Sequence, residues 1–461
     1  MANGRSKMSQ NQVEILQDDQ PLNPYTEIQI LPDHTDLIKF LLQISENKFL
    51  SVSDDNTGII WDIITCLKCS MLVGHTRPIT CATLVEPTSD DRPPGAEVPP
   101  SSPFLLTGSS DKTIRLWSTE TGTCLRVISE HNATTKAILS FPKSGLFCTG
   151  GQELFLWNSQ RQLLHQVSQE SEAGNSDCPL ADIKHMLAIP DDRFIVAAGC
   201  ALEVYAIDTQ IGQLGVTSYQ LRRVKKLAPQ HREAVMCLTS VSDSYFASAS
   251  LDGTVKVWNT RTLGTSRQLN HIKDYERNGF PWCVRHMLPL DKNHLCVTIG
   301  SGLAIFDIIT GDCLWKQLKA HYSKITFISV VYDGKFLATC SEDGMVRLWG
   351  VDTRLKVAEE GDYNGEEFSL HKFDSIVQAS RQSKETRRLF RREESRPPIL
   401  CLQGECVAHS GAVQMVLDFR EEGMVSCGAD GLVILWKDGV TESNKRNDVI
   451  REMLHARSGL F

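Results

Sequence analysis

The chain has 461 residues and a formal charge of −8 at neutral pH. This acidic balance argues against a general nucleic-acid-binding protein. No apolar run approaches the roughly 20 residues that a helix needs to cross a bilayer, and the N-terminal residues lack the apolar region of a signal peptide. We therefore expect a soluble, cytoplasmic protein that binds no nucleic acid and is not integral to a membrane.

The N-terminal region divides into two parts. Residues 1–22 are polar and show no periodicity, so we expect them to be disordered. Residues 25–31, YTEIQIL, have the composition of a β-strand and end shortly before His34. The repeated units that follow along the chain predict which unit this strand joins.

Five of these units share one pattern, in which a histidine precedes two short strands joined by a turn. In the clearest unit, residues 246–261, alternating residues are followed by Asp252-Gly253, a dipeptide typical of tight turns. In all five units an Asp lies six residues before a terminal Trp. The His, Asp and Trp of the units are His34, Asp55 and Trp61; His75, Asp111 and Trp117; His231, Asp252 and Trp258; His321, Asp343 and Trp349; and His409, Asp430 and Trp436.

Three weaker units fill the gaps between the strong ones. They end at Trp157, Tyr205 and Phe306, and each has a Gly in the region where the strong units have the Asp. The terminal aromatic residues therefore give eight units in total. Seven units remain an alternative if one of the weak units is irregular.

The repeats resemble those of WD-repeat proteins over roughly residues 25–436. The resemblance implies an all-β fold, a β-propeller with one four-stranded blade per repeat. It also implies a buried hydrogen-bonded network in each strong blade, such as His231, Ser248 and Asp252 around Trp258. Because the set recurs in every strong unit, we expect these residues to be structural rather than catalytic.

Two insertions interrupt the predicted propeller, which we place at residues 23–439. Residues 86–103 are rich in Pro and acidic residues, and residues 353–398 lack strand alternation, so both are expected to be flexible loops. The second insertion begins acidic and ends basic. It is either a solvated loop or a docking segment for a partner or an anionic membrane surface, with candidate binding residues Arg387, Arg388, Arg391 and Arg392.

The C-terminal region suggests both a closure and a helix. No outer strand follows Trp436, because Lys437 begins a polar stretch, so residues 25–31 are predicted to complete the last blade. Residues 440–461 are expected to form a helical tail that begins at Asn447 or Asp448. One stripe of this short helix would carry apolar candidate partner-binding residues, namely Val449, Ile450, Met453 and Leu454.

No catalytic or cofactor motif stands out. The sequence has no phosphate-binding Gly-rich loop, nucleophile elbow or paired-carboxylate motif. Cys66 and Cys69 have zinc-like spacing, but no second pair follows at a ligand distance, so packing is the favoured interpretation. We therefore expect no cofactor, no metal and no enzymatic activity.

Three segments, Asn23–Leu31, Cys340–Trp349 and Gly431–Gly439, resemble a particular family of WD-repeat subunits. The resemblance implies a scaffold that joins a pair of DENN-domain proteins acting on small GTPases, with roles in autophagy and recruitment to lysosomes. Residues 25–31 and 447–455 would then hold the DENN-domain partner. The insertion at 353–398 would dock to a lysosomal membrane protein.

A different assignment rests on residues 258–261. Trp258-Asn259-Thr260-Arg261 resembles the Trp-Asp-x-Arg box of WD-repeat substrate receptors for cullin ubiquitin ligases. That resemblance implies that Arg261 is the exposed contact. The alternative function is therefore a ligase substrate receptor, which co-purification with a cullin adaptor would distinguish from a DENN-complex subunit.

Overall fold

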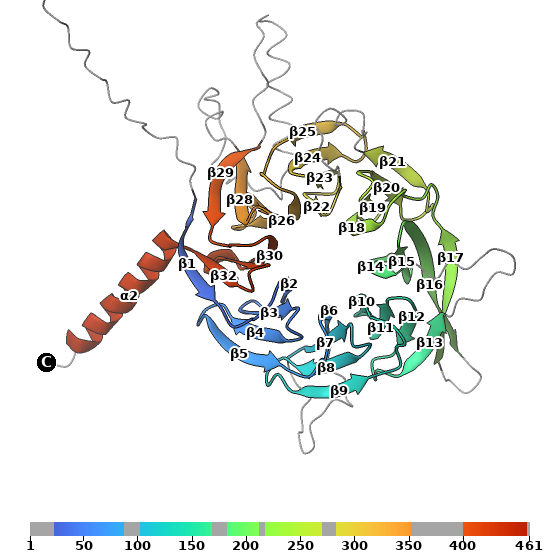
Figure 1. The fold of residues 1–461 in the computed structure, drawn as a ribbon, viewed down its shortest axis with the longest axis horizontal. Helices are drawn as coiled ribbons and strands as arrows, with labels where there is room; N and C mark the ends of the chain where they lie inside the picture. Colours follow the sequence, from blue (N-terminus) through green and yellow to red (C-terminus); the bar gives the residue numbers. More distant parts are fainter. Residues whose placement is uncertain are drawn as a thin grey trace, which may run out of the picture.

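The computed structural model describes residues 23–86, 102–167, 182–211, 217–269, 283–351 and 400–458. In these residues, 32 strands form eight four-stranded sheets. Figure 1 shows the sheets arranged as blades around a common axis, in chain order. The predicted all-β fold, an eight-bladed propeller, is thereby confirmed, and the seven-bladed alternative is excluded.

The first four blades each consist of four consecutive strands, and the innermost strand of each comes first. Their bounds are, for blade one, β2 (Ile38–Gln43), β3 (Lys48–Ser53), β4 (Gly58–Asp62) and β5 (Leu67–Leu72); for blade two, β6 (Ile79–Val85), β7 (Phe104–Ser109), β8 (Ile114–Ser118) and β9 (Cys124–Ile128); for blade three, β10 (Ala137–Phe141), β11 (Leu146–Gly150), β12 (Leu154–Trp157) and β13 (Leu163–Val167); and for blade four, β14 (Ile183–Ile189), β15 (Arg193–Ala198), β16 (Ala201–Ile211) and β17 (Thr217–Lys226).

Blades five to seven repeat this order, and blade eight takes its fourth strand from the N-terminus. Their bounds are, for blade five, β18 (Val235–Ser242), β19 (Tyr245–Ser250), β20 (Val255–Asn259) and β21 (Thr265–Leu269); for blade six, β22 (Met287–Pro289), β23 (His294–Ile299), β24 (Gly302–Asp307) and β25 (Cys313–Gln317); for blade seven, β26 (Ile325–Val331), β27 (Phe336–Ser341), β28 (Met345–Val351) and β29 (Leu400–Val407); and for blade eight, β30 (Val413–Asp418), β31 (Met424–Gly428), β32 (Val433–Asp438) and β1 (Tyr25–Leu31), with a short 3₁₀ helix, η6 (Arg420–Glu422), between β30 and β31.

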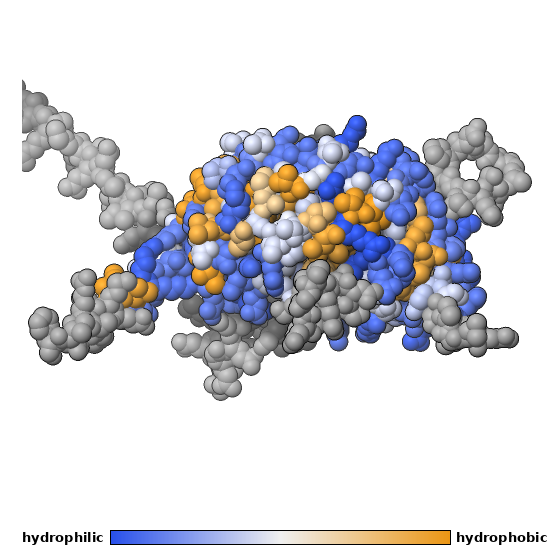
Figure 2. All heavy atoms as spheres, turned by 90° about the horizontal axis from the view of Figure 1, so that it is seen from below, coloured by the Kyte–Doolittle hydropathy of each residue, from blue (hydrophilic) through white to orange (hydrophobic). Residues whose placement is uncertain are grey.

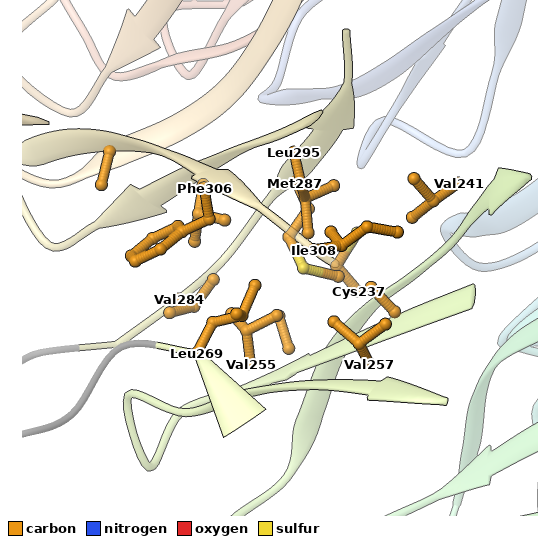
Figure 3. Close-up of a cluster of buried hydrophobic side chains, with 14 of the residues drawn as sticks. Cys237, Val241, Val255, Val257, Leu269, Val284, Met287, Leu295, Phe306 and Ile308 are labelled. Atoms are coloured by element: carbon orange, nitrogen blue, oxygen red, sulfur yellow. The ribbon is translucent and has the colours of Figure 1, made fainter. Parts of the chain in front are cut away.

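The apolar core lies between neighbouring blades. A single four-stranded sheet cannot bury both of its faces, so each blade packs its apolar side chains against the next one. Figure 3 shows one such interface, where Val255 and Leu269 of blade five approach Val284 and Phe306 of blade six. Similar buried clusters join the other blades, which explains why the fold requires a closed ring.

The ring closes through the two ends of the chain. Strand β1 pairs antiparallel with β32, and Ile28, Ile30 and Leu31 lie opposite Trp436, Ile434 and Val433. The side chains of Tyr25 and Leu31, at the two ends of β1, are buried. The predicted closure of the last blade by the N-terminal strand is therefore confirmed.

The C-terminal helix α2 (Gly439–Ser458) begins earlier than the sequence predicted. Asp438 at the end of β32 accepts hydrogen bonds at Oδ1 from the backbone N–H groups of Val440 (2.8 Å) and Thr441 (3.1 Å). The predicted caps, Asn447 and Asp448, were wrong and lie inside the helix. Because the cap is the last residue of a strand, the helix follows the propeller without a linker.

Several predictions concern residues that the structure does not describe. The N-terminal residues 1–22, nearly all of the insertion at 86–103 and the whole insertion at 353–398 are among them. The predictions for these segments therefore remain predictions.

Candidate functional site

Each strong blade contains a buried polar network, and blade five shows its parts. The indole N–H of Trp258 donates to Ser248 Oγ at 2.9 Å, and Ser248 Oγ lies 2.8 Å from His231 Nε2. His231 Nδ1 lies 3.0 Å from Thr254 Oγ1 and 3.5 Å from an Asp252 oxygen. When Ser248 donates its hydroxyl proton to His231 Nε2, every polar group of this network has a hydrogen-bond partner, as burial requires.

The same geometry recurs in blades one, two, seven and eight. In each of these blades the His Nδ1 approaches the Asp at 2.7 to 3.0 Å, and the His Nε2 and the Trp N–H share one hydroxyl. The hydroxyl is supplied by Ser51, Thr107, Thr339 and Ser426 in blade order. The structure thus brings together the His, Asp and Trp of all five strong units.

The weak blades keep only parts of this network. In blade three, Thr149 Oγ1 accepts from the Trp157 N–H and lies 2.9 Å from His131 Nε2, although Gly151 lies where the strong blades have the Asp. In blade four the Tyr205 hydroxyl donates to Glu203 at 2.9 Å, and in blade six Phe306 is buried by apolar packing. The contact between His131 and Thr149 was not predicted, although the order His, Thr, Trp in this unit could have indicated it.

In the network of blade two, the surroundings lower the pKa values of both Asp111 and His75. Burial alone would raise the pKa of Asp111, but hydrogen bonds from Thr113 and His75 outweigh it and lower the pKa to about 2. Burial lowers the pKa of His75 despite its contact with Asp111. The histidine is therefore neutral and the carboxylate ionised near neutral pH. We propose that such networks stabilise the blades and take no part in chemistry.

The stability of the folded protein should depend on pH through His131. Burial lowers its pKa to about 4, and its Nδ1 has no hydrogen-bond partner among the described residues. The unfolded chain takes up this proton near pH 6.5 but the folded chain does not, so stability is lost as the pH falls from 6.5 towards 4. We expect the loss from this residue to be about 3 kcal/mol. Denaturant unfolding from pH 7 to 4.5 should show a shallower pH slope for His131→Gln than for the unchanged protein, and equal slopes would contradict the expectation.

A second candidate site lies where the two ends of the chain meet. Figure 1 shows helix α2 leaving the ring beside β1 and extending away from it. On β1, Ile28 and Ile30 are each 50% exposed, and on α2 Val449 and Ile450 are 49% and 53% exposed. Figure 2 shows the apolar residues of α2 at the left of the ring. We call these four residues, with Val440, the seam surface.

Polar contacts fix the base of α2 to the ring. Arg446 forms an ion pair with Glu27 of β1, and Lys445 Nζ lies 3.0 Å from Glu422. Asp438, which caps the helix, also accepts a hydrogen bond of 2.6 Å from the Tyr332 hydroxyl of blade seven. The first two turns are therefore held, while Val449 and Ile450, further along the helix, are exposed.

The remaining candidate residues are placed as follows. Val449 and Ile450 are exposed, whereas the side chains of Met453 and Leu454 lie outside the described part of the structure, as do Arg387, Arg388, Arg391 and Arg392. Arg261 is exposed in the turn between β20 and β21. Cys66 is buried and Cys69 is exposed.

The described residues hold neither a metal-binding group of side chains nor a helix suited to cross a membrane. Within the described ranges, no three His, Cys, Asp or Glu side chains are grouped so that they could hold a metal ion. None of the helices in that part of the chain has the length and apolar content that a membrane crossing requires.

Eight four-stranded blades with repeated His, hydroxyl, Asp and Trp networks define a WD-repeat β-propeller. Residues 2–446 match the model of the WDR41 β-propeller family. The chain therefore belongs to the WDR41 family, as the sequence resemblance predicted.

Individual relatives agree with this assignment. The chain is 28% identical to "WD repeat-containing protein 41" of Mus musculus over 459 residues, covering 96% of this chain and 94% of the relative. It is 27% identical to the Homo sapiens protein of the same name, with the same coverage. Among solved structures, the computationally designed Ika8 protein matches with a TM-score of 0.58 at 18% identity, covering 88% of this chain and 98% of that one. This last likeness concerns the fold alone.

Proposed function

We propose that the chain is a non-catalytic scaffold subunit of a DENN-domain complex that regulates small GTPases, autophagy and lysosomal signalling. The support is its membership of the WDR41 family together with the exposed apolar seam surface. WD-repeat propellers generally mediate protein interactions, and the networks described above account for their polar side chains without a reaction. The single observation that carries the partner-binding proposal is the seam surface.

The seam surface has the properties of an interface rather than of ordinary exposed surface. Four aliphatic side chains from two neighbouring elements are about half exposed there. Helix α2 is 20 residues long and extends from the ring with Val449 and Ile450 facing solvent. A helix that projects in this way gains little from packing in the free protein, and exposed large apolar residues near one another on a surface often mark protein interaction sites.

The proposed occupant of the seam surface is the DENN-domain partner. Burying these aliphatic groups would favour association, while the contacts of Arg446 and Lys445 hold the helix in place beforehand. Because the base of the helix is fixed, little conformational entropy is lost when a partner packs on it. For the insertion at 353–398 we propose docking to a lysosomal membrane protein, which would bring the complex to lysosomes.

Co-purification with the DENN-domain pair tests this proposal. The double substitution Val449→Asp/Ile450→Asp should weaken recovery of the pair about tenfold or more, since two buried apolar contacts become buried charges. The matched control is Ser443→Asp/Asn444→Asp, which changes exposed polar residues of the same helix and should leave recovery unchanged. Deletion of residues 353–398 should also leave it unchanged.

Two outcomes would contradict the proposal. Full recovery of the DENN-domain pair with the Val449→Asp/Ile450→Asp protein would show that the seam surface is not the interface. Recovery of a cullin adaptor that is lost on Arg261→Ala would favour the alternative function, a ligase substrate receptor, which rests on the exposed position of Arg261.

A further inference from the structure

The outer strand of blade four differs from the other seven outer strands. Strand β17 spans 10 residues, whereas the others span 5 to 8. It carries four cationic residues, Arg222, Arg223, Lys225 and Lys226, while no other outer strand has more than one Lys or Arg. All four are exposed. In a chain with a net charge of −8, this concentration of positive charge is unexpected.

The positive charge is only partly neutralised by the neighbouring strand. Arg222 forms a two-point ion pair with Asp208 of β16, with contacts of 2.6 and 3.1 Å. Arg223 lies 3.8 Å from Glu203 of β16, and Lys225 donates to the Leu263 carbonyl of blade five at 3.0 Å. Strand β16 supplies only these two carboxylates against four cations. Within the described residues of β16 and β17, cations therefore outnumber carboxylates by four to two.

The cations lie on both faces of the sheet. Glu203 and Asp208 are five residues apart on β16, and side chains alternate along a strand, so the two carboxylates point to opposite faces. Arg223 and Arg222, which pair with them, therefore lie on opposite faces as well. A flat lipid surface would contact one face of this sheet only, whereas an added strand places its own side chains on both faces.

Strand β17 is the outermost strand of its sheet, where a further strand could pair. Strand β17 pairs with β16 on one side and has no other strand partner in the described residues. Lysines on an edge strand often serve only to prevent aggregation. Of the seven equivalent edges of the same ring, four carry a single Lys or Arg and three carry none, so protection of the edge alone does not account for four cations on one blade.

We propose that the outer edge of β17 binds an acidic extended segment of a partner protein by strand addition. Backbone hydrogen bonds to β17 supply the register, and carboxylates on both faces of the added strand pair with Arg222, Lys225 and Lys226. Figure 1 shows β17 and the seam surface at β1 on opposite sides of the ring, so one propeller can hold both partners at once. The proposal does not depend on the identity of the partner at the seam.

A labelled peptide of about twelve residues that repeats Glu-Glu-Thr-Val is a suitable probe, since adjacent Glu residues place carboxylates on both faces of the strand and its length matches the edge. Fluorescence polarisation with the full chain at low salt measures its binding. The triple substitution Arg222→Gln/Lys225→Gln/Lys226→Gln should weaken binding about tenfold. The matched control, Arg126→Gln/Arg267→Gln/Lys316→Gln, removes three cations from other outer strands and should change binding less than about twofold.

Further binding measurements distinguish strand addition from other modes of binding. A peptide of equal charge with Pro at alternate positions cannot form the ladder and should bind weakly. Equal binding of the Pro peptide, or equal binding by the triple variant and its control, would overturn the proposal. So would binding of phosphatidylserine vesicles that is lost in the triple variant while the peptide is not bound. The Val449→Asp/Ile450→Asp protein should bind the peptide normally, which separates this site from the seam surface.

Discussion

Deletion of residues 25–31 should lower the melting temperature of the protein by about 5 °C or more. Strand β1 forms the outer edge of blade eight and buries Tyr25 and Leu31. Losing these two side chains and the ladder to β32 removes at least about 5 kcal/mol from the free energy of unfolding. The loss also leaves the edge of β32 unpaired. A thermal unfolding scan of both proteins measures the difference.

Single substitutions within β1 provide a matched test of the same closure. Leu31→Ala removes a buried side chain and should cost about 2–4 kcal/mol. Ile30→Ala, one residue away, truncates a side chain that is half exposed, so its cost should stay below about 1 kcal/mol. Unchanged stability in the deletion protein, or equal effects of the two substitutions, would contradict a ring closed by this strand.

Ser248→Ala should destabilise the protein by about 2–4 kcal/mol, because two buried groups lose the same partner. The Trp258 N–H and His231 Nε2 both contact Ser248 Oγ and are buried. Ser248→Thr should cost less than about 1 kcal/mol, since the equivalent position is Thr107 in blade two and Thr339 in blade seven. Denaturant unfolding at constant pH measures these differences.

The control for the hydroxyl prediction is on the neighbouring strand. Ser240 of β18 is exposed, so Ser240→Ala should change stability by less than about 0.5 kcal/mol. If Ser248→Ala were as harmless as Ser240→Ala, the shared hydroxyl would have no structural role. The same result would mean that a shared hydrogen-bonded network does not explain the repeated His, Asp and Trp residues.

The repeated residues made most of the fold predictable from the sequence. The spacing from His to Asp to Trp, as in His231, Asp252 and Trp258, marks a blade because burial of polar groups demands fixed partners. The number of weak units could also be predicted, because each ends in a large aromatic residue. Trp157, Tyr205 and Phe306 all pack at the same place in their blades. The closure followed from a missing outer strand after Trp436.

Other features were less accessible because they depend on spatial neighbours. The cap of α2 was misplaced because apolar periodicity finds the stripe with Val449 and Ile450 but cannot show that Asp438, at the end of a strand, starts the helix. The hydroxyls that complete four of the networks, such as Thr107, are common residues within strands and were not identified individually. The basic edge of β17 stands out only when the eight outer strands are compared as structural equivalents.

Hydrogen exchange of the full chain tests the central claim, a ring closed by its own N-terminal strand, most directly. Amides of residues 25–31 that face β32 should be protected to a similar degree as those of Val433–Asp438, because the two strands share one ladder. Rapid exchange throughout residues 25–31 with protected residues in the other blades would contradict the closure.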